Sequence, residues 1–131
     1  MQFYIAVVHK EEASAYGLGF PDLPGCFSAA DSWDEVLARA TEALDLYFED
    51  AEPVAPRSIG EIRDDPEVAA ALAEGAVLMP IPYVPAEGRQ VRANISLDRG
   101  LLRAIDEVAA RRRMTRSSFL ASLARREITG I

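Results

Sequence analysis

RQVRANISLDRGLLRAIDEVAARRRMTRSSFLASLARREI, residues 89–128, is the stretch that decides the fold. Between Val91 and Leu97 apolar residues alternate with polar ones, the period of a strand with one buried and one exposed face. Asp98 can then cap a first helix, whose apolar face holds Leu101, Leu102, Ile105, Val108 and Ala109. Thr115 or Ser117 can cap a second helix, whose inner face holds Phe119, Leu120, Leu123, Ala124 and Ile128.

One strand and two helices of this size bury too little surface to fold alone, and a single strand leaves both edges unpaired. Pairing with a second copy in a two-fold dimer solves both problems. Antiparallel pairing of the two strands would place Arg92, Asn94 and Ser96 of both chains on one face of a ribbon, which fits a DNA major groove about 12 Å wide. Arg reads guanine, Asn reads adenine and Ser reads either, so these residues suit base recognition.

The pattern R-x-N-x-S-L, followed by two helices joined by RRRMTRSS, resembles a ribbon-helix-helix domain. The resemblance implies base reading by Arg92, Asn94 and Ser96. It also implies that the start of the second helix, at Thr115, Arg116 and Ser117, binds DNA phosphate, where free amides and the helix dipole favour an anion. Family members often place Gly where this chain has Arg113. If the backbone there is left-handed, the side chain costs about 1 kcal/mol relative to Gly.

Charge divides the chain into two parts. Its 131 residues carry a net charge of −7, but residues 1–88 hold 17 acidic and 4 basic side chains, a net −13. Residues 89–131 hold 4 acidic and 10 basic side chains, a net +6. The basic part suits phosphate and the acidic part suits a basic partner, although an acidic surface can equally serve solubility alone.

Composition bounds the remaining classes. No apolar run approaches the roughly 18 residues that span a bilayer, and the start, MQFYIAVVHKEE, reads as a strand rather than a secretion signal. We therefore expect a cytoplasmic protein. Cys26 and His9 are the single cysteine and the single histidine. Within one chain they form neither a disulfide nor an ordinary zinc site, so we expect no metal or other cofactor.

The first 84 residues predict a small α+β layer. Strands are expected at residues 3–8, 16–20, 26–30 and 76–84. Phe3 to Val8 is apolar on both faces, which is typical of a central strand, whereas Pro80 and Pro82 make the last strand an edge strand. S-W-D-E predicts a helix that begins at Ser32 with a capping box to Glu35. Asp65 can cap a helix that starts at Pro66 and ends by Gly75.

This order predicts a three- to four-stranded sheet with helices on one face. Residues 85–88, PAEG, are the expected linker between an N-terminal domain, 1–84, and a C-terminal domain, 89–131. The ribbon demands a homodimer, and pairing of the N-terminal domains would raise it to a tetramer.

GLGFPDLPGCFSAADSWDEVLARATEAL, residues 17–44, resembles the N-terminal domain of HicB-type antitoxins. Together with the ribbon-helix-helix pattern, the resemblance spans most of the chain. It implies a partial ribonuclease H-like domain that binds and neutralises a HicA-type toxin, a small basic enzyme that cleaves mRNA. It also implies a C-terminal domain that binds the operator DNA of its own operon and represses it.

Three acidic residues are candidates for contact with the toxin: Asp22 in the FPDLPGC loop, and Glu42 and Asp45 on the outer face of the helix after Ser32. The sheet edge is a second candidate surface. A working nuclease would need several carboxylates converging on cations about 4 Å apart. The acidic residues here fall mainly on helix exteriors and in loops, so we expect no enzyme activity and expect Asp22 to bond amides of its own turn. The alternative is a ribbon-helix-helix repressor whose N-terminal domain senses a small organic ligand.

Overall fold

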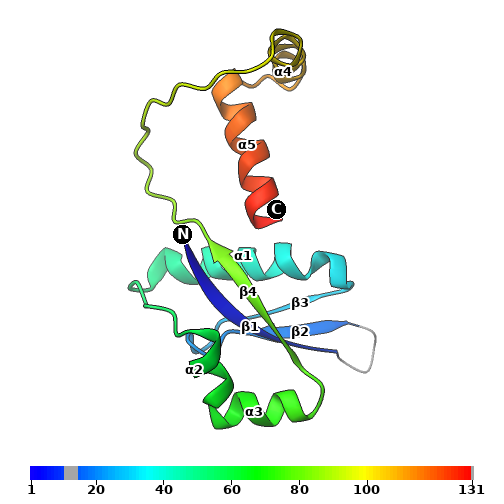
Figure 1. Ribbon diagram of the computed structural model, residues 1–131, viewed down its shortest axis with the longest axis vertical. Coiled ribbons are helices and arrows are strands. Elements are labelled where there is room, and N and C mark those ends of the chain that lie inside the picture. Colours follow the sequence, from blue (N-terminus) through cyan, green and yellow to red (C-terminus); the bar gives the residue numbers. More distant parts are fainter. Residues whose placement is uncertain (11–14, 131) are drawn as a thin grey trace. The chain divides into compact units, whose positions relative to one another are not determined.

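The computed structural model describes residues 1–10 and 15–130, which divide into two compact units, Met1–Pro85 with Thr129–Ile131, and Ala86–Ile128. The first unit contains β1 (Gln2–Lys10), β2 (Tyr16–Gly19), β3 (Phe27–Ala30), a 3₁₀ turn η1 (Trp33–Glu35), α1 (Val36–Asp50), α2 (Ile59–Asp64), α3 (Pro66–Ala73) and β4 (Val77–Tyr83). The other helices are α4 (Arg99–Arg111) and α5 (Arg116–Thr129). Figure 1 shows these elements along the chain.

The four strands form one antiparallel sheet in the order β3-β2-β1-β4. The predicted central position of the first strand is confirmed, because β1 pairs with both β2 and β4. The predicted edge position of the last strand is confirmed as well. Pro80 lies opposite Ile5 and Pro82 opposite Phe3, within seven consecutive residue pairs of β4 and β1. Because β4 pairs with β1 along its inner edge, the nitrogens of Pro80 and Pro82 lie on the outer edge of the sheet. These nitrogens cannot donate a hydrogen bond to a further strand.

Helices cover both faces of the sheet, so the expectation of helices on one face is wrong. On one face Tyr4, Ala6 and Val8 of β1 pack with α1, and on the other Ile5 packs with Ile62 of α2 and Val68 of α3. Figure 1 shows α1 on one side of the strands and α2 with α3 on the other. The reason lies in β1 itself, because a strand with apolar residues on both faces needs cover on both.

The helix starts are set by caps, one of them misplaced in the sequence prediction. Ser32 makes no side-chain cap, since the Glu35 amide donates to the Ser32 carbonyl oxygen (3.2 Å) inside a 3₁₀ turn. The capping box lies instead at Ser58 and Glu61, with both reciprocal bonds at 3.2 Å, and begins α2. The predicted cap of α3 is confirmed, because Asp65 accepts a hydrogen bond from the Glu67 amide (3.0 Å).

The second unit has a small core of its own. Ile105 and Ala109 of α4 and Phe119 of α5 are buried against one another. Residues 84–98 carry no strand in the single chain, so the strand expected at 91–97 is not formed there. A strand exists only through hydrogen bonds to a neighbour, and this segment has none within its own chain. No helix in the described part of the chain is long and apolar enough to cross a membrane.

Candidate functional site

The three predicted base-reading residues, Arg92, Asn94 and Ser96, lie in the extended segment before α4, and all are exposed. The apolar residues that alternate with them are exposed too: Val91 is 84% and Ile95 65% exposed. An exposed row of large apolar side chains is unusual on the surface of a complete soluble domain. The segment therefore has the pattern of a strand whose apolar face lacks a cover.

The connection between α4 and α5 is closely defined by backbone hydrogen bonds. The Met114 amide donates to the Ala109 carbonyl (2.9 Å) and the Arg113 amide to the Ala110 carbonyl (3.1 Å). This is the Schellman arrangement that ends a helix, and it needs a left-handed residue at Arg113. Arg113 has φ +56°, so the left-handed backbone considered from the sequence is present without a glycine. The start of α5 is thereby held close to the end of α4.

Thr115 caps α5, because its hydroxyl oxygen accepts a hydrogen bond from the Ser118 amide (3.1 Å). This cap leaves the amides of Arg116 and Ser117 in the first helical turn, where no acceptor exists within the helix. The Arg116 guanidinium is engaged by Asp106 of α4, with nitrogen–oxygen distances of 2.9 and 2.8 Å. The hydrogen bond with Arg116 lowers the pKa of Asp106, and the same bond raises the pKa of Arg116.

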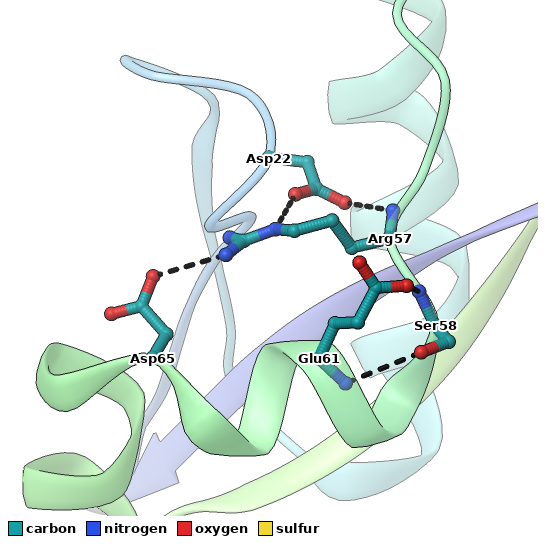
Figure 2. A network of polar contacts seen from close by, with 5 residues as sticks. All are labelled: Asp22, Arg57, Ser58, Glu61 and Asp65. Atoms are coloured by element: carbon teal, nitrogen blue, oxygen red, sulfur yellow. Dashed lines mark hydrogen bonds and ion pairs between the residues drawn. The ribbon is translucent and has the colours of Figure 1, made fainter.

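Asp22 belongs to a network that joins the PDLPG turn to the starts of α2 and α3 (Figure 2). Its Oδ2 accepts from the backbone amide of Arg57 (2.9 Å) and its Oδ1 from Nε of Arg57 (2.5 Å). Nη1 of Arg57 also donates to Oδ2 of Asp65 (3.3 Å). The amide that Asp22 bonds thus belongs to Arg57, and not to its own turn as expected. Only 8% of the Asp22 side chain is exposed, so it acts mainly within the fold.

Arg57 is the residue that the sequence prediction missed. The hydrogen bond with Asp22 is the main cause that raises the pKa of Arg57, followed among the favourable causes by the charge of Asp22 and the bond with Asp65. A signal existed, because Arg57 is one of 4 basic residues within residues 1–88. A basic residue in so acidic a domain is expected to pair with a carboxylate, but the sequence does not show which carboxylate that is.

Glu42 and Asp45 lie on the exposed side of α1. Glu42 pairs with Arg39 across one helical turn (2.8 Å). Because α1 covers one sheet face whereas Asp22 is tied to the helices on the other, the three acidic candidates do not form one site. Each surface therefore needs its own test.

Cys26 is buried, and its thiol donates to the Ala43 carbonyl oxygen (3.6 Å). Burial raises the pKa of this thiol to about 11, so it stays protonated at neutral pH. His9 is an exposed residue of β1. Among residues 1–10 and 15–130 no group of three or more His, Cys, Asp or Glu side chains is arranged to hold a metal ion.

Comparisons with known proteins identify the family. A model described as HicB_like antitoxin of bacterial toxin-antitoxin system matches residues 4–124. The crystal structure of the Burkholderia pseudomallei antitoxin HicB is 30% identical with a TM-score of 0.54, and the match covers 95% of this chain and 94% of that one. Antitoxin HicB3 is 31% identical with a TM-score of 0.53, covering 97% and 98%.

A chain from the HicA3 and HicB3 toxin-antitoxin complex is similar at 23% identity and a TM-score of 0.53, covering 64% of this chain and 100% of that one, which shows the fold alone. The family model, in contrast, extends over nearly the whole sequence and over both units. The chain therefore belongs to the HicB-like antitoxins of bacterial toxin-antitoxin systems.

Proposed function

We propose that this antitoxin neutralises a small basic HicA-type toxin through a partial ribonuclease H-like N-terminal domain, and represses its own operon as a ribbon-helix-helix dimer. The observation that carries the proposal is the uncovered apolar row of residues 91–97 in a part of the chain with net charge +6. An uncovered strand calls for a second copy, and a basic surface calls for phosphate. The protein acts by binding, with no reaction of its own.

In the dimer, Val91, Ile95 and Leu97 of both chains face the helices, while Arg92, Asn94 and Ser96 share the outer face of the ribbon. These three polar residues then enter the major groove and read base edges. The Schellman turn supports this arrangement because it fixes where α5 begins relative to α4. The first amides of α5 are thereby available for a DNA phosphate.

Phosphate binding at α5 rests on the backbone amides of Arg116 and Ser117 rather than on the Arg116 guanidinium. That side chain is held by two bonds to Asp106. The Thr115 hydroxyl is likewise occupied as the cap, although its position orients the amides. Thr115, Arg116 and Ser117 therefore remain the proposed phosphate-binding residues, with the amides at the helix start as the donors.

The DNA half is tested by a gel shift on the operator with Arg92→Ala and Asn94→Ala. Each substitution removes a base contact worth about 1–3 kcal/mol, so sequence preference over unrelated DNA falls about 5- to 150-fold. Arg89→Ala is the matched control, because it removes the same charge outside the alternating row. It should reduce affinity for all sequences equally and keep the preference. Unchanged preference in both test variants would sink the DNA half.

The toxin half rests on the acidic charge of residues 1–88, net −13, and on the HicB3 relative found in a complex with HicA3. Opposite charges speed and orient the encounter of the two proteins. The test is growth rescue: co-expression of the full chain with the toxin encoded beside it should restore growth, and residues 1–84 alone should suffice. Failure of that fragment to rescue, with the full chain active, would contradict the assignment of toxin binding to the N-terminal domain.

A further inference from the structure

The sheet face that carries α2 and α3 is only half covered. These helices pack over β1 and β4, through Ile5, Val7 and Leu78. On the remaining half, β2 and β3 carry a row in register with Val7, because Val7 lies opposite Gly19 and Gly19 lies opposite Phe27. Gly19 contributes no side chain to this row. A bare backbone position in a strand often marks a place where another group approaches closely.

A cavity of about 430 Å³ opens on this uncovered half. Val7 and Gly19 form its floor, Val68 and Ala71 of α3 form one wall, and Leu23 and Pro24 of the PDLPG turn form another. The volume lies within the range of known binding pockets, about 300–1,000 Å³. All of its lining belongs to the first unit.

Phe27 stands at the edge of this cavity and is 75% exposed. Its ring lies over Gly19, since a Cβ on Gly19 would come within 2.9 Å of Phe27 Cδ1. An aromatic side chain this exposed beside an apolar hollow is typical of a surface that a partner covers. A pocket for a small metabolite encloses its ligand more completely than this open hollow would. Such pockets bury about 70–90% of the ligand surface.

The charge around the cavity indicates the chemistry of that partner. Glu67 lines the cavity, and Glu74, two helical turns later, lies on the same side of α3 by helical spacing. Both side chains are exposed. An occupant that complements the site therefore carries an apolar side chain for the hollow and Lys or Arg beside it for the carboxylates.

We propose that this cavity is the docking site for an apolar side chain on a basic segment of a protein partner; the inference rests on the proposed function, in which that partner is the toxin. The network of Asp22, Arg57 and Asp65 holds the PDLPG wall against the start of α3. Asp22 thus contributes to toxin binding by positioning the PDLPG wall, and it does not contact the toxin itself. A wall fixed before binding lowers the cost of ordering the interface.

The test fills the cavity in the full chain and measures toxin affinity by calorimetry. Ala71→Phe places a ring in the hollow, and Ala69→Phe, on the exposed opposite side of the same helix, is the matched control. Loss of a central anchor raises Kd about 30-fold or more in Ala71→Phe and leaves Ala69→Phe at the wild-type value. Glu67→Lys raises Kd about three- to tenfold, with a steeper loss at low salt.

A second measurement maps the site without any substitution. Unlabelled toxin is titrated into the isotope-labelled full chain, and amide shifts at Gly19, Phe27 and Ala71 support the inference. Equal affinity of wild type and Ala71→Phe, or shifts confined to the α1 residues Glu42 and Asp45, overturns the cavity assignment and leaves the antitoxin function standing. Absence of any binding by the wild-type chain overturns the toxin half of the proposed function itself.

Discussion

The two units of this antitoxin differ in how completely their own chain buries their apolar residues. In the first unit, a strand with two apolar faces is covered by helices on both sides, and Ala6, Leu44 and Ile62 are fully buried. In the second unit, three residues are buried, while Val91 and Ile95 face solvent. The first unit therefore has what it needs to fold as a single copy. The second leaves part of its apolar surface uncovered, as expected of a unit that pairs with a second copy in the proposed dimer.

Charge follows the same division. Residues 1–88, which hold the well-buried core of the first unit, are acidic, and residues 89–131, which hold the exposed apolar row, are basic. Two basic units brought together would repel each other in isolation, and DNA phosphate relieves that repulsion. In the proposed function, dimer formation and operator binding would therefore be coupled through the same residues.

The largest expected effect comes from Ile95→Asp, which would prevent the second unit from pairing with a second copy. In the single chain Ile95 is 65% exposed, so the change does little there, but in the dimer it would bury a carboxylate in the shared core. We expect the mass in solution to fall to half that of the wild-type protein and operator binding to be lost. Analytical ultracentrifugation checks the mass, and Arg92→Ala should remain a dimer. An Ile95→Asp protein that keeps the wild-type mass and still binds the operator would refute the ribbon.

Leu44→Ala tests the completeness of the first unit. Leu44, on the inner face of α1, is fully buried, and its truncation should lower the free energy of unfolding by about 2–5 kcal/mol. Leu46→Ala is the matched control on the same helix, where the side chain is 68% exposed, and it should change stability by less than about 0.5 kcal/mol. Urea unfolding of the two variants measures both values, and similar losses would show that α1 does not bury this face.

The smallest effect is expected from Arg113→Gly in the second unit. Arg113 is left-handed, with φ +56°, so glycine relieves a cost of about 1 kcal/mol and should raise the stability of that unit. Arg111→Gly is the comparison, since it removes the same charge from the last helical residue and should destabilise by about 1 kcal/mol. Thermal unfolding in the absence of DNA measures both effects: the midpoint should rise for Arg113→Gly and fall for Arg111→Gly.

Patterns within a few residues predicted much of this structure. The apolar run of β1, the prolines of β4 and the cap residues Asp65 and Asp98 each act on their near neighbours, and each was found where expected. The sequence offers two capping boxes, however, S-W-D-E at Ser32 and S-I-G-E at Ser58. Only the second forms: the chain after Ser32 begins with a 3₁₀ turn in which the Ser32 side chain accepts no capping hydrogen bond, whereas Ser58 and Glu61 make both reciprocal bonds.

Contacts between residues far apart in the sequence could not be predicted from such local patterns. Asp22 and Arg57 are 35 residues apart, and nothing local pairs them. The second layer of helices was implied by the two apolar faces of β1, but only the fold shows that α2 and α3 supply it. The predicted base-reading and phosphate-binding residues stay predictions, because their arrangement depends on a second chain and on DNA.

The two edges of the sheet are unequal, and this limits how copies can assemble. The β4 edge carries Pro80 and Pro82, whose nitrogens cannot donate, whereas the short β3 edge carries no proline. If two sheets ever joined through β3, both outer edges of the combined sheet would be β4. The combined sheet could then not add a third copy, because both of its outer edges would carry prolines.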